Sequence, residues 1–155
     1  QAIIEASRCV QCGMCHDSCP THMDAPEYIR SIWEGDLEEA VRWIYKTNPL
    51  AHVCGRVCTH RCEAACSISR RGEPVAIRWL KRYAMDALGH EQVKKIAAEG
   101  MSGHSSGKRI AIVGSGPAGI ACAYYLSVLG AAVTVYEANR VVGGRLACGA
   151  LARPR

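Results

Sequence analysis

Eight of the ten cysteines in this 155-residue chain fall into two sets of four with the spacing of metal ligands. The first set lies in the run CVQCGMCHDSCP, and it comprises Cys9, Cys12, Cys15 and Cys19, followed by Pro20. In the spacing C-x2-C-x2-C-x3-C-P, a tight loop turns three thiolates toward one 4Fe-4S cluster, and the fourth thiolate ligates a second cluster. The first set therefore predicts an iron-sulfur site.

The second set lies in the run CGRVCTHRCEAAC, and it comprises Cys54, Cys58, Cys62 and Cys66. Two 4Fe-4S clusters need eight thiolates, which is the number that the two sets supply together. We expect the sets to cross, with one cluster held by Cys9, Cys12, Cys15 and Cys66 and the other by Cys19, Cys54, Cys58 and Cys62. Because the ligands of each cluster are distant in sequence, cluster assembly and folding would be one event.

Zinc and disulfides are the alternatives for these cysteines. C-x2-C pairs also build structural zinc sites, and a disulfide framework is the third possibility. Four cysteines in one overlapping run favour clusters over zinc, which two separate pairs normally close. Nearby imidazoles could replace a thiolate, and nearby guanidinium groups could offset the charge of a cluster or simply face water. These side chains are His16, His22, His52 and His60, and Arg8, Arg56, Arg61, Arg70 and Arg71.

The run GSGPAG, from Gly114 to Gly119, has the pattern G-x-G-x-x-G and predicts a dinucleotide site. It follows the apolar run RIAIV and precedes a helix, and a second strand, AVTVYE, ends at Glu137, near the position expected for an acidic ribose contact. Gly114 would make the tight turn, Gly116 would admit the pyrophosphate, and Gly119 would let helix and strand pack closely. The helix N-terminus would then offer N–H groups to the phosphates. The spacing does not distinguish FAD from NAD, and a glycine turn without a ligand is the alternative.

Helices must position the cysteine sets. We expect Asp24 to cap a helix with Glu27 as its capping-box partner, and Gly35 to end that helix. Asp36 should cap a second helix, which should stop at Asn48 because a proline follows.

A third helix should follow the second cysteine set. Pro74 suits its first turn, because the fixed φ of proline fits the start of a helix and its missing N–H is not needed there. The apolar face of this helix would consist of Ile77, Leu80, Ala84 and Leu88.

The chain should form two unequal parts. We expect an α-helical two-cluster iron-sulfur domain over 1–99, a Gly/Ser-rich linker over 100–108, and a partial α/β, Rossmann-like βαβ dinucleotide segment over 109–155. Two strands and one helix cannot bury both faces of a parallel sheet, so we expect a longer chain or another chain to complete it. Cys122 should be a small packing residue, and the lone Cys148 argues against a flavin disulfide reductase site.

Charge and composition exclude several functions. The formal charge of +5 is modest, the basic residues are scattered and there is no Phe, so no nucleic-acid surface is expected. No run is long enough for a transmembrane helix, and the start QAIIEASRCV lacks a secretory leader pattern, which favours a cytoplasmic protein. No Ser/His/Asp constellation or carboxylate pair indicates hydrolysis.

The chain resembles the NAD(P)H-dependent iron-sulfur flavoproteins that include the glutamate synthase small subunit and dihydropyrimidine dehydrogenase. The resemblance follows family order over nearly the full length, in CVQCGMCHDSCP, TNPLAHVCGRVCTHRCEAAC, GEPVAIRWLKRYAMD, IAIVGSGPAGIACAYYL and VTVYEANRVVGGRL. It implies that the glycine turn binds FAD. The FAD contacts that it implies are Gly114, Gly116, Pro117, Ala118, Gly119 and Glu137, with Gly143, Gly144 and Arg145 as weaker candidates.

The chain departs from this family pattern at two points. Some relatives ligate a cluster through Gln or Glu on the helix after the second set, where this chain has Lys81. An ammonium group cannot ligate, which favours Cys54 as the missing ligand. In addition, no second glycine fingerprint for NAD(P)H follows the first.

We therefore expect an electron-transfer module of an oxidoreductase, which passes electrons between FAD and a partner's redox centre through two 4Fe-4S clusters. Its partners should be other redox subunits in a hetero-oligomeric complex, or the rest of a longer flavoprotein, without membrane insertion. A cluster-only electron wire without flavin and a zinc-stabilised interaction module are the alternatives.

Overall fold

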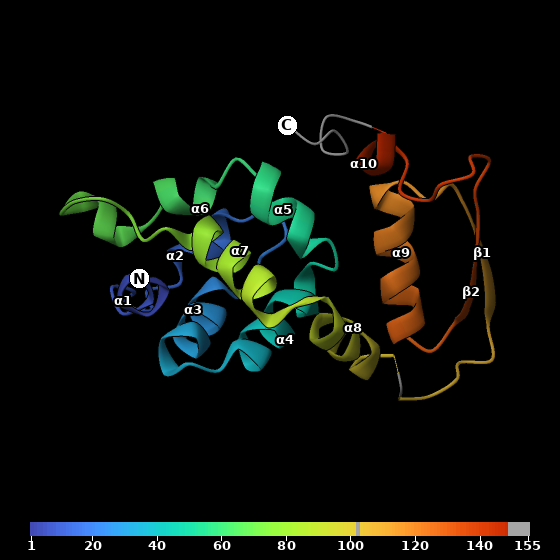
Figure 1. The fold of residues 1–155 in the computed structure, drawn as a ribbon, viewed down its shortest axis with the longest axis horizontal. Helices are drawn as coiled ribbons and strands as arrows, with labels where there is room; N and C mark the ends of the chain where they lie inside the picture. Colours follow the sequence, from blue (N-terminus) through green and yellow to red (C-terminus); the bar gives the residue numbers. More distant parts are fainter. Residues whose placement is uncertain (102, 149–155) are drawn as a thin grey trace. The chain divides into compact units, whose positions relative to one another are not determined.

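The computed structural model describes residues 1–101 and 103–148. Contacts between residues divide the chain into two units, Gln1–Ala97 and Ala98–Arg155 (Figure 1). Each unit is described by itself below. The division falls near the end of the sequence-predicted helical domain, and the finer boundaries, 1–99, 100–108 and 109–155, stay predictions.

The first unit is built from helices. Most are short. In chain order the helices are α1 (Ala2–Ala6), α2 (Met14–Ser18), α3 (Ala25–Glu34), α4 (Leu37–Thr47), α5 (Ala51–Val57), α6 (Arg61–Ala64), the 3-10 helix η1 (Ser67–Arg70), α7 (Ile77–Leu88) and α8 (His90–Glu99). Three amphipathic helices of 10 to 12 residues, α3, α4 and α7, form its centre.

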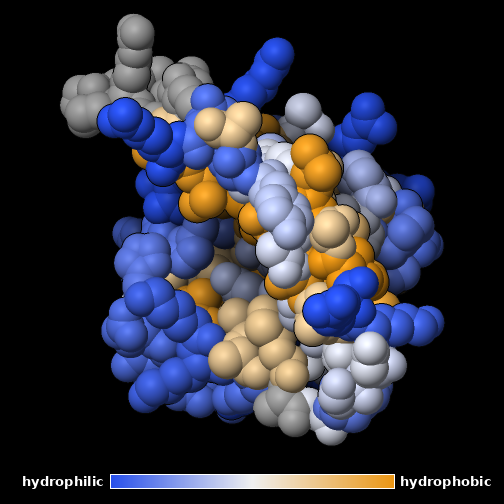
Figure 2. All heavy atoms as spheres, turned by 90° about the vertical axis from the view of Figure 1, so that its right-hand side faces the viewer, coloured by the Kyte–Doolittle hydropathy of each residue, from blue (hydrophilic) through white to orange (hydrophobic). Residues whose placement is uncertain are grey.

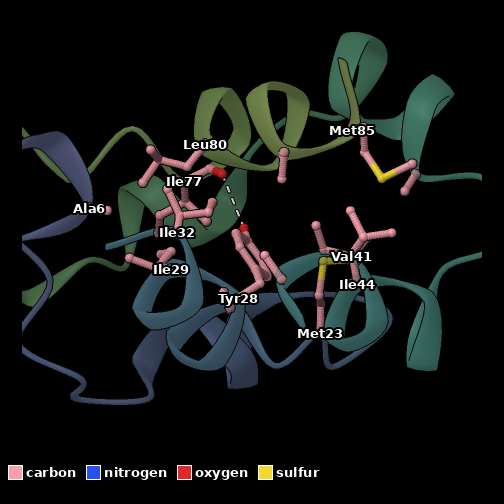
Figure 3. Close-up of a cluster of buried hydrophobic side chains, with 14 of the residues drawn as sticks. Ala6, Met23, Tyr28, Ile29, Ile32, Val41, Ile44, Ile77, Leu80 and Met85 are labelled. Carbon is pink, nitrogen blue, oxygen red and sulfur yellow. Dashed lines mark hydrogen bonds between the residues drawn. The ribbon is translucent and has the colours of Figure 1, made fainter. Parts of the chain in front are cut away.

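The core lies where the apolar faces of α3, α4 and α7 meet (Figure 3). Tyr28 of α3 is fully buried, and its hydroxyl donates to the carbonyl oxygen of Ile77, the first residue of α7, at 3.1 Å. This bond matters because a buried hydroxyl without a partner would destabilise the core. The other large side chains labelled there include Met23, which precedes α3, Ile29 and Ile32 of α3, Val41 and Ile44 of α4, and Leu80 and Met85 of α7.

The predicted ends of α3 and α4 are confirmed. Gly35 ends α3 in the left-handed conformation, with φ of +85°, which glycine adopts at little cost. Asp36 caps α4, because its side chain accepts a hydrogen bond from the backbone N–H of Glu39 at 2.9 Å. Asn48 follows the last residue of α4. These ends follow from local chemistry that the sequence displays.

The predicted capping box of α3 is wrong. Asp24 stands at the N-cap position, but its side chain caps no backbone N–H. It instead accepts a hydrogen bond from Lys46 Nζ at 3.1 Å, and Glu27 pairs with Arg30. A contact with α4 has therefore replaced the local cap.

The predicted position of Pro74 in a helix is also wrong, because α7 begins only at Ile77. The segment before α7 is held by the N-terminal region. Glu5 Oε1 accepts the backbone N–H of Ala76 at 2.9 Å, and the Arg8 guanidinium donates to the carbonyl oxygen of Pro74 at 3.5 Å. These contacts keep residues 74–76 out of the helix.

The second unit contains a short parallel sheet. Strand β1 (Arg109–Val113) pairs with β2 (Ala132–Tyr136), with Arg109 opposite Ala132 and Val113 opposite Tyr136. Helix α9 (Pro117–Val128) connects the two strands, and α10 (Arg145–Cys148) follows. This strand–helix–strand order is the predicted βαβ arrangement.

Apolar residues of the second unit remain exposed in the described part of the chain. Helix α9 is apolar on all sides, and none of its residues is fully buried. Figure 2, which looks onto the second unit, shows hydrophobic residues at the molecular surface. The predicted packing role of Cys122 is wrong for this chain, because Cys122 is exposed. Within the second unit, α9 packs against β1 and β2.

No helix among the residues that the structure describes is both long enough and apolar enough to span a membrane.

The two N-cap aspartates provide a stability test. Asp36→Ala should lower the free energy of unfolding by about 1 kcal/mol, because it removes a side-chain cap. Asp24→Ala should cost less, since Asp24 caps nothing and its pair with the exposed Lys46 contributes roughly 0 to 1 kcal/mol. The measurement is urea unfolding of the anaerobically purified chain. An equal or larger loss in Asp24→Ala would contradict this account of the helix ends.

Candidate functional site

The first cysteine set lies on a loop and on the short helix α2. Cys9 and Cys12 precede the helix, Cys15 lies within it, and Cys19 follows its last residue. The loop turns sharply, because Gln11 and Gly13 both have left-handed backbones, with φ of +56° and +78°. A non-glycine residue in that conformation is uncommon and is held there by its surroundings.

The cysteines of the second set lie within short helices or at their ends. Cys54 is in α5 and Cys58 directly follows it, Cys62 is in α6, and Cys66 precedes the 3-10 helix. His60 separates α5 from α6, with a left-handed φ of +42°. Each cysteine set thus contains a left-handed non-glycine residue between its thiols.

Most of the second set lines a pocket of about 380 Å³, here called the larger pocket. Its cysteines are Cys15, Cys19, Cys54, Cys58 and Cys62. Apolar wall residues include Met23, Tyr28 and Ile77, and cationic side chains of Arg61, Arg78 and Lys81 also line it.

The remaining three thiols, together with Cys15, line a second pocket of about 20 Å³, here called the smaller pocket. Its cysteines are Cys9, Cys12, Cys15 and Cys66, and its apolar wall includes Pro26, Ile29 and Val75. Cys15 and Ile77 line both pockets. The eight thiols thus gather around two adjoining pockets, each of which takes cysteines from both sets.

The described residues contain no group of three or more His, Cys, Asp and Glu side chains that could hold a single metal ion. The thiols instead line the walls of the two pockets. Among the four histidines considered from the sequence, His60 lines the larger pocket, whereas the rings of His16 and His22 lie 5.3 Å apart, and that of His52 lies 5.1 Å from His90.

Burial and mutual repulsion disfavour the thiolate form at Cys15 and Cys62. Burial, followed by the nearby Cys9 and Cys62 thiols, raises the pKa of Cys15 to about 12. Burial, followed by Glu63 and the Cys19 and Cys58 thiols, raises the pKa of Cys62 to about 11. A metal that binds these sulfurs must therefore displace protons, which makes its binding tighter at higher pH.

Hydroxyl groups favour the thiolate at two other cysteines. The Ser67 hydroxyl donates to Cys12 Sγ at 3.1 Å and, as the largest cause, lowers the pKa of Cys12. Burial raises the pKa of Cys19, but hydrogen bonds that include Thr21 Oγ1 at 3.3 Å, together with the charge of Lys81, outweigh burial and lower it.

The glycine turn of the second unit needs glycine for steric reasons. Gly114 has a φ of +93° and lies at the end of β1. A Cβ at Gly119 would lie 2.0 Å from the carbonyl oxygen of Gly114, so helix α9 could not approach the turn. At Gly116, the N-cap of α9, a Cβ would meet no atom within 4 Å. The backbone at Gly116 is therefore open to a bound group.

Glu137 is held beside this turn by four hydrogen bonds. One oxygen accepts from Ser115 N at 2.9 Å and Ser115 Oγ at 2.5 Å, and the other accepts from Asn139 N at 2.9 Å and Asn139 Nδ2 at 2.8 Å. These bonds, led by the Ser115 hydroxyl, lower the pKa of Glu137 to about 2. The sequence pattern did not predict a role for Ser115 and Asn139, because neither occupies a fixed position of the G-x-G-x-x-G fingerprint.

The weaker candidates lie near the same turn. The Gly143 N–H donates to Ser115 Oγ at 3.1 Å, and a Cβ on Gly144 would lie 3.1 Å from the Cα of Gly116. Pro117 and Ala118 form the first turn of α9, and the exposed Arg145 begins α10.

Comparison with known protein families gives two matches. Residues 1–93 match the family described as dihydropyrimidine dehydrogenase domain II, 4Fe-4S cluster. Residues 112–154 match the NAD(P)-binding Rossmann-like domain, a description that names NAD(P) and not FAD.

Curated relatives support the same resemblance. The chain is 39% identical over 153 residues to the NADP(+)-dependent formate dehydrogenase subunit beta of Moorella thermoacetica, with 87% of this chain and 22% of the relative covered. It is 42% identical over 137 residues to the NADPH-Fe(3+) oxidoreductase subunit beta of Geobacter sulfurreducens, with 87% and 20% covered. It is 36% identical over 153 residues to the glutamate synthase [NADPH] small chain of Escherichia coli, with 96% and 32% covered. The chain thus spans between a fifth and a third of the length of these relatives.

Two glycine substitutions should separate fold from binding at the turn. Gly119→Ala should destabilise the second unit by roughly 1 to 3 kcal/mol, because its Cβ overlaps the Gly114 carbonyl. Gly116→Ala should leave the unit folded, because its φ of −66° suits alanine, but should weaken dinucleotide binding. Hydrogen exchange over residues 109–136 measures the first effect, and a binding titration with FAD and with NADPH measures the second. Faster exchange in Gly116→Ala than in Gly119→Ala would contradict this reading.

Proposed function

The chain belongs to the dihydropyrimidine dehydrogenase domain II, 4Fe-4S cluster family, and on that basis we propose that it is the electron-transfer module of an NAD(P)H-linked iron-sulfur flavoprotein. In this proposal two 4Fe-4S clusters carry electrons between FAD and a partner's redox centre. The observation that carries the proposal is the gathering of eight thiols around two adjoining pockets. Each bound cluster would supply a site that takes up and gives back one electron.

The donor sets of both pockets suit 4Fe-4S clusters. We assign Cys19, Cys54, Cys58 and Cys62 to the larger pocket and Cys9, Cys12, Cys15 and Cys66 to the smaller one. The larger pocket has room beside its thiols. The smaller pocket has about the volume of one water molecule, so its loop must move outward when a cluster is seated. Cys12, on that loop, is exposed, whereas Cys15 and Cys66 belong to the buried core.

The chain's own residues would enclose the clusters and set them close together. Tyr28, Ile77 and Met23 give the larger pocket an apolar wall that excludes water. The two pockets share Cys15 and Ile77, so two clusters seated there would be near neighbours. Short separation between redox centres is what a module that passes single electrons requires.

For the second unit we propose FAD as the dinucleotide. Gly114, Gly116 and Gly119 would receive the pyrophosphate at the N-terminus of α9, with Pro117 and Ala118 in its first turn, and Glu137 would accept hydrogen bonds from a ribose. The support is the open backbone at Gly116 and a carboxylate already fixed beside it. Gly144 and Arg145 would lie at the edge of this site. The choice of FAD over NAD(P) rests on the family resemblance.

Further protein would complete the second unit. The relatives are three to five times longer than the matched part, and several are named as subunits. Exposed apolar side chains of the strands, among them Val113 and Tyr136, also call for a covering layer. We propose that this layer comes from the rest of a longer flavoprotein or from partner redox subunits, in a cytoplasmic complex without nucleic acid or membrane insertion.

The cofactor assignment is tested by the absorption spectrum of anaerobically purified chain before and after dithionite, with flavin and zinc measured on the same sample. We expect a broad visible band that bleaches on reduction, and FAD released on denaturation. Bleaching without flavin would contradict the FAD part and leave a cluster-only wire. A featureless spectrum with bound zinc would contradict the electron-transfer function.

The crossed ligand sets are tested by pairs of alanine substitutions. Cys9→Ala and Cys66→Ala should each remove one cluster, and the double variant should retain about four iron per chain, because both thiols serve the same cluster. Combining Cys9→Ala with Cys58→Ala should remove both clusters.

The control is Cys122→Ala, at an exposed cysteine outside both pockets, which should keep the full iron content. The measurements are iron content and the electron paramagnetic resonance signal of the remaining reduced cluster. If the Cys9 and Cys19 variants behave as one pair and the Cys58 and Cys66 variants as the other, the ligand sets are not crossed.

A further inference from the structure

Lys81 is a buried cationic residue, and it is not among the cysteines assigned as cluster ligands. It lies on the core-facing side of α7 and is 7% exposed, although lysine is rarely buried without a charged partner. Its side chain lines the larger pocket with Cys19, Cys54, Cys58 and Cys62.

The larger pocket is positively charged as a whole. Besides Lys81, its lining includes the cationic side chains of Arg61 and Arg78, and the part of its lining that the structure describes includes no Asp or Glu. Glu63 lies outside the lining, and its carboxylate accepts the backbone N–H of Arg78 at 2.9 Å.

The smaller pocket differs in charge. Its described lining contains no Lys or Arg. Arg8 lies outside this lining and pairs with Glu5 at 2.6 Å, which offsets its charge. A buried lysine therefore distinguishes the larger pocket from the smaller one.

A cation inside the larger pocket would affect electron transfer directly. A 4Fe-4S cluster with four thiolate ligands is negatively charged, and it gains one further negative charge when it accepts an electron. A nearby positive charge stabilises the reduced form more than the oxidised form, and water screens this effect poorly in an enclosed site. Charge and burial are among the features that set cluster potentials.

We propose that Lys81 raises the reduction potential of the cluster held by Cys19, Cys54, Cys58 and Cys62, without ligating it. The cluster in the smaller pocket is not affected to the same degree. This inference rests on the proposed function, since it requires a cluster in the larger pocket. Lys81 is then a tuning residue, which favours the electron on one of the two clusters.

The test is Lys81→Met, which removes the charge and keeps a side chain of similar length. The full chain is purified anaerobically and titrated with dithionite, while electron paramagnetic resonance follows each cluster. We expect one signal to move to lower potential and the other to stay in place. The signal that moves must be the one that Cys58→Ala abolishes.

Two further variants separate charge from structure. Lys81→Arg keeps the positive charge and should restore the higher potential. Lys94→Met removes a lysine whose side chain is 72% exposed and pairs with Glu91, so it should move neither signal. If Lys81→Met fails to bind the cluster of the larger pocket, Lys81→Leu, which is also neutral and offers no ligand, takes its place in the comparison with Lys81→Arg.

Loaded clusters with unchanged potentials in the neutral variants would overturn this inference and leave the proposed function intact. A potential in Lys81→Arg as low as in Lys81→Met would also overturn it, because charge would then not be the cause. A wild-type chain without iron would overturn the proposed function and this inference together.

Discussion

The first unit depends on one constraint: thiols from two distant segments must meet around two adjoining pockets. The segments containing Cys9 to Cys19 and Cys54 to Cys66 are separated by α3 and α4, which pack with α7 to form the core. That core therefore serves the pockets as well as its own stability. Tyr28 and Ile77 show the connection, because they are joined by a hydrogen bond in the core and both line the larger pocket.

Bringing the thiols together has an electrostatic cost. Burial and neighbouring thiols raise the pKa of Cys15 to about 12 and that of Cys62 to about 11, so a group of free thiolates is unfavourable there. Hydrogen bonds from Ser67 and Thr21, and the charge of Lys81, act in the opposite direction. Iron bound at the sulfurs would remove the remaining cost, which explains why cluster binding and folding should be coupled.

Local chemistry was predictable from the sequence, and distant contacts were not. Gly35 and Asp36 marked the ends of α3 and α4 because each acts on its own backbone. The cysteine spacing predicted the crossed ligand sets, which stay a proposal. Asp24 and Pro74 failed as local signals, because Lys46 binds the first and the N-terminal segment holds the residues around the second. The burial of Lys81 and the hold of Ser115 on Glu137 likewise arise from residues that meet only in the folded chain.

The central claim, that eight cysteines hold two 4Fe-4S clusters, is tested most directly by native mass spectrometry of the anaerobically purified chain. The account predicts a chain mass increased by two 4Fe-4S units and reduced by the protons that the thiols release. A mass that shows bound zinc, a single cluster, or the bare chain in protein kept without oxygen would contradict it.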